Sequence, residues 1–188
     1  MPEQPHIVGI GGTTRDGSSS EKALRFALQI CEASGATTAC FVGDKLVLLP
    51  HYAPEDPDRV PEAKELIEEL RRADGIILAS PGYHGGVSGL VKNAIDYTED
   101  MRDDDPPYFA GRPVGVIAAA YGWQATVTTL EALRSIAHAL RGWPTPLGAA
   151  INSSEKVFGP AGEVTDERVR FQLTTVAEEV LAFARAKP

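Results

Sequence analysis

Glycines, hydroxyl side chains and one arginine gather in residues 11–20, GGTTRDGSSS, directly after a short apolar run. The hydroxyls of Thr13, Ser18 and Ser20 are of the type that donates to phosphate oxygens. Arg15 adds a charged donor that can bind phosphate with two nitrogens. The free N–H groups and the dipole of a following helix would favour an anion at the same place. The pattern is neither a Walker A loop nor GxGxxG, and it predicts a phosphate site, with a Ser-capped polar turn as the alternative.

A second candidate segment, residues 80–89, reads SPGYHGGVSG and also follows an apolar run. Pro81 and the glycines, among them Gly82 and Gly85, predict an irregular loop whose backbone can approach a flat ring. Its N–H groups would bond the carbonyl oxygens of a heterocycle, and Tyr83 would supply an aromatic wall. The alternative is a glycine-rich connection without a ligand.

The third candidate segment, residues 118–124, reads AAAYGWQ after another apolar run. Tyr121 and Trp123 flank Gly122, and two aromatic rings around a glycine would line a pocket for a planar ligand. The same two aromatic side chains would equally well cap the core or form a subunit contact.

The elements that must position these segments alternate along the chain. Apolar runs typical of buried strands lie at residues 6–11, 37–42, 75–79, 112–120 and 146–151. Helical spacing of apolar residues follows each of them, at residues 21–34, 63–70, 90–100, 130–140 and 169–183. Residues 45–61 read as a loop, although 45–49 could pair as a strand. This order predicts an α/β fold of three layers, a doubly wound sheet of five parallel strands between helices. Right-handed crossovers then bring all three candidate segments to one edge of the sheet, where ligands bind.

Size and charge narrow the class of protein. With 188 residues the chain is expected to form one domain, residues 1–188, and its net charge of −8 argues against nucleic acid as a partner. Cys31 and Cys40 show no metal-ligand spacing and read as reduced thiols. The first residues lack the pattern of a secretory signal, and no apolar run approaches the length of a membrane span, so we expect a cytoplasmic protein with no membrane partner.

In this order and spacing, the segments resemble the NADPH-dependent FMN reductase family, a flavodoxin-like group that includes quinone, azo-dye and chromate reductases. Residues 12–20 match the phosphate loop of that family, approximately G-S-x-R-x-x-S-x-[NS], with Thr13 in place of the first serine. The flavin-ring loop of the family is approximately P-x-Y-x-x-x-x-x-G-x-[LV]-K-[NT]. It is matched by Pro81, Tyr83, Gly89, Val91, Lys92 and Asn93. The family often has Glu and Asn beside the loop tyrosine, where this chain has Gly82 and His84.

The resemblance implies a flavodoxin-like fold, bound FMN and hydride transfer from NADPH or NADH. The phosphate would be held by Thr13, Arg15, Ser18 and Ser20, and the ring by Pro81, Tyr83, His84 and Gly85. The resemblance also implies a small-molecule acceptor such as free flavin or a quinone, and a homodimer or homotetramer. A reductase that releases reduced FMN would serve a flavin-dependent monooxygenase.

Some roles stay open at this point. His84 would donate to the flavin or substrate, or would be a solvated loop residue. No side chain is needed as acid or base for hydride transfer, so we predict no catalytic residue. Asp103–Asp105 reads as a solvated run, and no metal is expected. The alternatives to a reductase are an electron carrier or regulatory module that binds FMN without oxidising NAD(P)H, and a flavin-free protein for another phosphorylated ligand.

Overall fold

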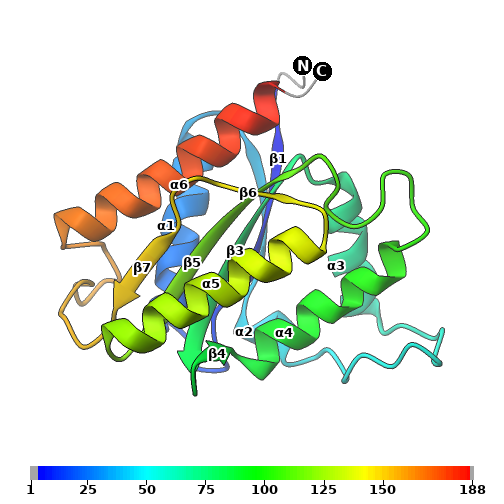
Figure 1. Ribbon diagram of the computed structural model, residues 1–188, viewed down its shortest axis with the longest axis horizontal. Coiled ribbons are helices and arrows are strands. Elements are labelled where there is room, and N and C mark those ends of the chain that lie inside the picture. The colour runs from blue at the N-terminus through cyan, green and yellow to red at the C-terminus, as the bar shows by residue number, and fades with distance from the viewer. Residues whose placement is uncertain (1–3, 187–188) are drawn as a thin grey trace.

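A parallel sheet runs through the centre of the molecule, in a computed structural model that describes residues 4–186 (Figure 1). The strands are β1 (His6–Gly11), β2 (Thr37–Phe41), β3 (Gly75–Tyr83), β4 (Gly86–Val87), β5 (Pro113–Ala120), β6 (Trp143–Pro144) and β7 (Ala149–Asn152). Their order is β2-β1-β3-β5, with β6 and β7 both paired to β5, and only β4 runs antiparallel to its neighbour. The first three residues, on which the expectation of no secretory signal partly rests, lie outside the described part.

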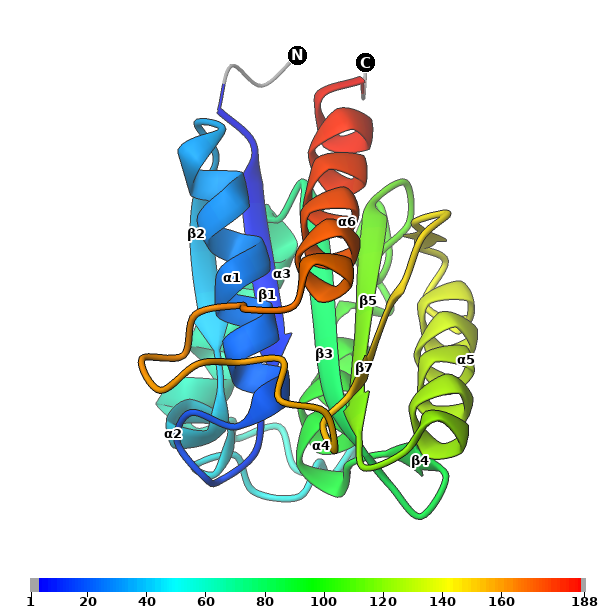
Figure 2. The ribbon, with the colours of Figure 1, turned by 90° about the vertical axis from the view of Figure 1, so that its left-hand side faces the viewer.

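Helices cover both faces of this sheet. They are α1 (Ser19–Ala33), α2 (Gly43–Leu46), α3 (Pro61–Arg72), α4 (Gly89–Asp96), α5 (Trp123–Ala139) and α6 (Glu167–Ala186), with the 3₁₀ helix η1 (Tyr97–Met101) after α4. One core cluster packs α1 and α6 against one face, and the other packs α3, α4 and α5 against the opposite face (Figure 2). Strand side chains alternate between the two clusters: Ile7 joins the first, and Val8 joins the second. The predicted doubly wound three-layer fold is confirmed.

Two local predictions need correction. The last strand, expected at residues 146–151, begins only at Ala149 as β7, and a short further strand, β6, lies before the expected range at Trp143–Pro144. Both β6 and β7 pair in parallel with β5, so together they occupy the place of the fifth strand in the predicted parallel sheet. Residues 45–49 form no strand: α2 is followed by a turn, and this coiling buries Leu46 and Leu49 in the core.

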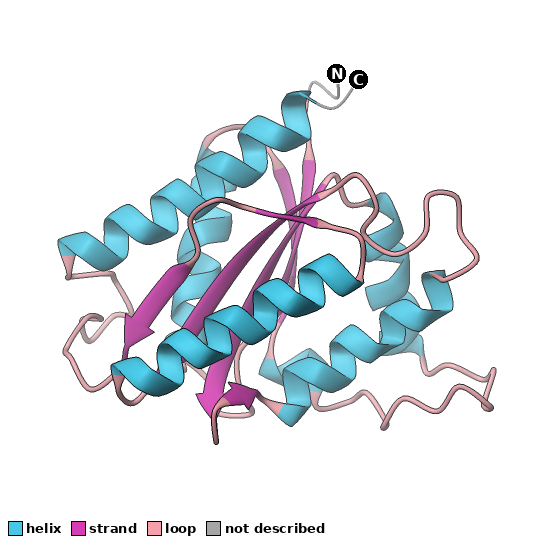
Figure 3. Ribbon diagram, in the orientation of Figure 1, coloured by secondary structure: helices cyan, strands magenta, loops and turns pink. Residues whose placement is uncertain are grey.

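The order of the strands reverses between β1 and β3. The chain leaves β1 through α1 toward β2 on one side, whereas β3 and β5 extend the sheet on the other. Gly11 is in register with Ala79 of β3, and Pro81 is in register with Ala119 of β5. The carboxyl ends of the three central strands therefore lie at one edge, with the switch point between the first two (Figure 3).

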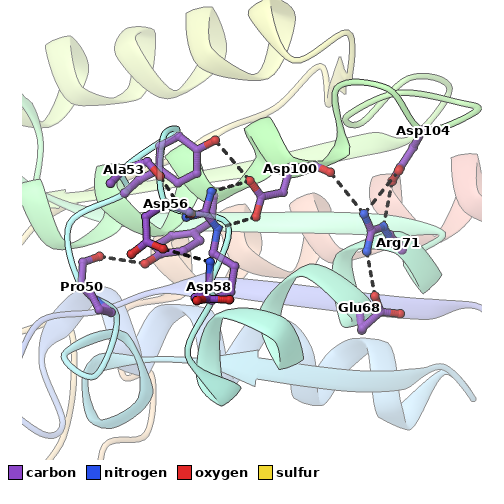
Figure 4. A network of polar contacts seen from close by, with 11 residues as sticks. Pro50, Ala53, Asp56, Asp58, Glu68, Arg71, Asp100 and Asp104 are labelled. Carbon is purple, nitrogen blue, oxygen red and sulfur yellow. Dashed lines mark hydrogen bonds and ion pairs between the residues drawn. The ribbon is translucent and has the colours of Figure 1, made fainter.

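Arg59 fixes the long segment 47–60 to this body through Asp100, and Figure 4 shows Ala53 and Asp56 of that segment near Asp100. The Nε and Nη2 of Arg59 donate to the two carboxylate oxygens of Asp100 at 2.7 and 2.8 Å, and Nη1 donates to the carbonyl of Ala53 at 2.9 Å. The guanidinium also lies 4.7 Å from the ring centre of Tyr52 and 5.5 Å from that of Tyr97. The hydrogen bond from Arg59 lowers the pKa of Asp100. We call this set of five residues the Arg59 cluster.

None of the helices described in residues 4–186 is both long and apolar enough to cross a membrane.

Candidate functional site

The first candidate segment forms the turn between β1 and α1. Ser18 is the N-cap of α1, and its Oγ accepts a hydrogen bond from the N–H of Glu21 at 3.4 Å. The Glu21 carboxylate in turn accepts from the N–H of Gly17, the residue before the N-cap, at 3.1 Å, which closes the turn one residue earlier than a capping box would. The Ser20 hydroxyl lies 3.5 Å from that of Ser18, and both residues are buried. The capped turn considered as an alternative is thus present.

The capping leaves donors free at the same helix end. In the described part of the chain, the N–H groups of Ser18, Ser19 and Ser20 donate to no protein acceptor. Arg15 is exposed, and its guanidinium takes part in none of the hydrogen bonds or ion pairs within residues 4–186. Free amides at a helix N-terminus beside a free arginine suit a phosphate. This segment, residues 11–20, is called the phosphate loop below.

The hydroxyl of Thr13 is used within the loop itself. Its Oγ1 accepts from the N–H of Arg15 and donates to the carbonyl of the same residue, both at 3.1 Å. This side chain therefore shapes the turn that presents Arg15.

Gly43, a residue that the sequence did not point to, packs against the backbone of the phosphate loop at Thr13. A Cβ atom at this position would lie 1.9 Å from the carbonyl oxygen of Thr13. Only glycine lets the start of α2 come so close to the phosphate loop.

The second candidate segment is a β-hairpin, and the prediction of an irregular loop was wrong. Strand β3 continues through Pro81 to Tyr83 and pairs with β4, with Tyr83 opposite Gly86. His84 and Gly85 form the two-residue turn, with φ of 51° and 84°. Both central residues of such a tight turn need positive φ, which glycine adopts freely. Tyr83, His84 and Gly85 are exposed at the end of the hairpin.

Buried hydroxyls hold this hairpin against the sheet. Ser80 Oγ accepts from the N–H of Ser88 at 3.0 Å and donates to the carbonyl of Pro81 at 2.8 Å. Thr129 of α5 donates to the carbonyl of Gly86 at 3.4 Å. The hairpin therefore has a fixed place beside the start of α5.

The third segment lies at the carboxyl end of β5, next to the hairpin. A hollow of about 420 Å³ is lined by residues of both segments, which are Gly85, Tyr121, Gly122, Trp123, Gln124, Ala125 and Thr128. Tyr121 is 84% exposed and Trp123 is 47% exposed, so neither ring caps the core. We call this space the aromatic hollow.

Asn152, at the end of β7, fixes the Tyr121–Gly122 turn. Its Oδ1 accepts from the N–H of Gly122 at 2.9 Å and from the N–H and Oγ of Ser154 at 3.1 and 2.7 Å. The side chain is nearly buried, at 7% exposure of the residue. Asn152 could not be predicted from the sequence, because nothing local links it to a turn thirty positions earlier.

The structure brings the predicted residues together as two groups at one sheet edge. Gly85 lines the aromatic hollow together with Tyr121 and Gly122, and Pro81, Gly82, Tyr83 and His84 belong to the strand and turn that lead to Gly85. Thr13, Arg15, Ser18 and Ser20 lie at the carboxyl end of β1, across the switch point (Figure 2). Gly12 at the start of the phosphate loop is tied to β3, because its N–H donates to the carbonyl of Ala79 at 3.3 Å.

Two residues of the ring-loop motif have partners elsewhere. Asn93 accepts from the N–H of Tyr52 at 2.9 Å and donates to the carbonyl of Pro50 at 2.9 Å, so it fixes the segment 47–60. Lys92 pairs with Asp96 one helical turn later. Neither side chain faces the aromatic hollow as a lining residue.

The two thiols are poor nucleophiles. Burial raises the pKa of Cys31 to about 12, and burial also raises the pKa of Cys40. Both are free cysteines that stay protonated near neutral pH. Among residues 4–186, no group of three or more His, Cys, Asp or Glu side chains is arranged to hold a metal ion.

Comparison with known proteins agrees with this geometry. Residues 5–156 match the family described as NADPH-dependent FMN reductase. An NAD(P)H-dependent FMN reductase of Pseudomonas aeruginosa is 28% identical over 172 residues, covering 90% of each chain. An FMN-dependent NADPH-azoreductase of Staphylococcus aureus is 29% identical over 127 residues, which is 66% of this chain and 64% of the relative. FerB, a flavoenzyme NAD(P)H:(acceptor) oxidoreductase of Paracoccus denitrificans, has the same fold, with a TM-score of 0.77 at 19% identity over 97% of this chain and 98% of the other.

Proposed function

The chain belongs to the NADPH-dependent FMN reductase family, and on that premise we propose that the phosphate loop and the aromatic hollow form its FMN site. The protein is an NAD(P)H-dependent oxidoreductase with FMN as cofactor. In the proposed site, Arg15 and the amides of Ser18–Ser20 bind the phosphate, with the hydroxyls of Thr13, Ser18 and Ser20 beside them. The hairpin Pro81–Gly85 and the Tyr121–Gly122 turn contact the ring.

One observation carries this assignment. The first amides of every α-helix lack an intrahelical acceptor, and here those of Ser18–Ser20 lie at the switch point of the sheet, next to Arg15, whose guanidinium has no partner within residues 4–186. A helix N-terminus with a free arginine at the switch point of an α/β sheet is the arrangement that suits an anionic ligand. The exposed aromatic rings at the neighbouring strand ends suit the planar end of the same ligand.

The side chains of this site bind and orient; they do not transfer protons. Bound at this site, FMN would supply the hydride and electron-transfer chemistry. Donors on a rigid turn can stabilise negative charge without having to reorganise, and the N–H groups of the hairpin turn serve the ring in this way. The anchoring of the hairpin by Ser80 and of Gly122 by Asn152 keeps those donors in place. We assign no catalytic acid or base.

NAD(P)H and the acceptor use the aromatic hollow in turn. The aromatic hollow adjoins the hairpin, and with the ring bound there the two substrates would share its exposed side and bind alternately. The acceptor class we propose is free flavin, a quinone or a similar small molecule, with a flavin-dependent monooxygenase as the user of released flavin. His84, exposed at the tip of the hairpin, stays a candidate contact to the substrate.

We also propose a homodimer or homotetramer in the cytoplasm. Val127, one turn after Trp123 on α5, is 49% exposed, and a second copy of the chain would cover both side chains beside the hollow. Analytical ultracentrifugation tests this part, and a monomer at all concentrations contradicts it.

Steady-state oxidation of NADPH, measured with added FMN and a quinone, tests the function. We expect turnover that requires FMN and follows ping-pong kinetics, with parallel double-reciprocal lines. Binding of FMN without oxidation of NADPH or NADH would instead make the protein an electron carrier. If the protein did not bind FMN, the proposed cofactor would be wrong, and the phosphate loop would have to bind another phosphorylated ligand.

A further inference from the structure

Glu21 places a negative charge inside the phosphate loop. The residue is 3% exposed, and both carboxylate oxygens have partners. Oε2 accepts from the N–H of Gly17 at 3.1 Å, and Oε1 accepts from Nε of Arg25 at 2.8 Å. The carboxylate is therefore fixed beside Ser18, the first of the three residues with free amides, and it occupies one loop amide that an anionic ligand would otherwise receive.

On the side of the loop that faces Gly43 and Asp44, the surroundings do not compensate for this charge. A hollow of about 390 Å³ beside it is lined by three carboxylates, those of Asp16, Glu21 and Asp44. Arg25 is the one cationic side chain among the described residues that line it, and it is already paired with Glu21. A phosphate dianion on the loop thus meets Arg15 and the free amides on one side and a fixed, only partly neutralised carboxylate on the other.

From this arrangement we propose that Glu21 sets the affinity of the protein for FMN, by opposing the phosphate that the rest of the loop attracts. This inference rests on the proposed FMN site. FMN is then held loosely and exchanges with the free pool, which distinguishes the protein from a flavoprotein with a permanently bound cofactor. Because the effect acts on the phosphate, riboflavin, which has the same ring and no phosphate, is unaffected by Glu21.

Fluorescence titration of FMN and riboflavin against the wild type and the Glu21→Gln variant tests the proposal. Glutamine keeps the shape of the side chain and an oxygen for the Gly17 amide, while it removes the charge. We expect the variant to bind FMN about tenfold more tightly, with riboflavin affinity unchanged within about twofold. The variant should also retain FMN through gel filtration, where the wild type loses it.

Two further variants complete the test. Glu178→Gln removes an exposed carboxylate of α6, and it should leave both affinities unchanged. Arg25→Gln leaves Glu21 without its cation, so FMN should bind several-fold more weakly and riboflavin as before; this variant decides the matter if Glu21→Gln does not fold. Equal FMN affinity in the wild type and in the Glu21 and Arg25 variants, or a parallel change for riboflavin, overturns the inference and leaves the FMN site standing. Failure of the wild type to bind either flavin overturns both.

Discussion

Two polar loop regions of this molecule, each built around an arginine, use their donors in opposite ways. In the Arg59 cluster the guanidinium donates to Asp100 and to two carbonyls and lies against the edge-to-face pair of Tyr52 and Tyr97. In the phosphate loop Arg15 is exposed, and three neighbouring amides have no acceptor in the described chain. A cluster with every donor satisfied stabilises the fold, whereas free donors at a sheet edge are available to a ligand. Substitutions in the Arg59 cluster should therefore change stability, and substitutions in the phosphate loop should change ligand binding.

The largest effect is expected at Asp100. The side chains of Arg59 and Asp100 are 12% and 21% exposed, so replacement of Asp100 by Ala leaves a largely buried guanidinium without its partner. We expect a loss of about 3 kcal/mol in the free energy of unfolding. Urea denaturation measures it, and FMN affinity should stay unchanged.

Asp104→Ala is the matched control, because Asp104 pairs with Arg71 in a more exposed place, where the side chains are 29% and 38% exposed. Such a pair contributes less than about 1 kcal/mol. Equal losses of stability in the two variants would contradict the special role of the Arg59 cluster.

Arg15→Ala should show the reverse pattern. Loss of a charged hydrogen bond to the phosphate is expected to weaken FMN binding by about 1.5–3 kcal/mol, while the unfolding free energy changes by less than about 0.5 kcal/mol. Flavin fluorescence titration measures the first and urea denaturation the second. Arg102→Ala, which removes another exposed arginine, is the control and should leave FMN binding as it is. Unchanged FMN affinity in Arg15→Ala would remove this residue from the site.

The contrast between the regions also explains what the sequence could predict. Alternating apolar runs and helical stripes identify the doubly wound sheet, and the phosphate loop is recognisable because its residues are contiguous. The S-x-x-E pattern of Ser18 and Glu21 is equally local, and it would have identified Ser18 as the N-cap of α1. The Arg59 cluster could not be predicted, because Arg59 and Asp100 are 41 positions apart and meet only through packing.

The prediction of an irregular loop at residues 80–89 was wrong for a different reason. Glycine-rich sequence shows that many backbone conformations are open, but not which one is adopted. Here the choice of His84 and Gly85 as a two-residue turn depends on pairing between β3 and β4 and on the contact of Thr129 with Gly86. These contacts join residues that are brought together only by folding, so the local sequence could not indicate the turn.

Asn152→Ala should have a smaller effect, shared between stability and ring binding. The variant loses the acceptor for the Gly122 amide, and we expect a cost of about 1–2 kcal/mol in unfolding free energy. Hydrogen exchange of the Gly122 amide should accelerate, and riboflavin should bind several-fold more weakly. Unchanged exchange at Gly122 would show that the turn is held by other contacts.

The smallest effect is expected in how the contribution of the Arg59–Asp100 pair to the free energy of unfolding changes at acid pH. Because Arg59 lowers the pKa of Asp100 below its unfolded value of 3.8, the pair adds stability above that pH. This contribution is lost as the pH falls through the lowered folded-state pKa. The stability difference between the wild type and Asp100→Asn should therefore shrink below about pH 4. A difference that stays constant from pH 7 to pH 3 would contradict the assigned pKa direction.

A crystal structure of the FMN complex tests the central claim most directly. We expect the FMN phosphate to contact the amides of Ser18–Ser20 and the guanidinium of Arg15. The ring should lie between the Pro81–Gly85 hairpin and the Tyr121–Gly122 turn. A phosphate bound elsewhere, with the amides of Ser18–Ser20 still free, would contradict it.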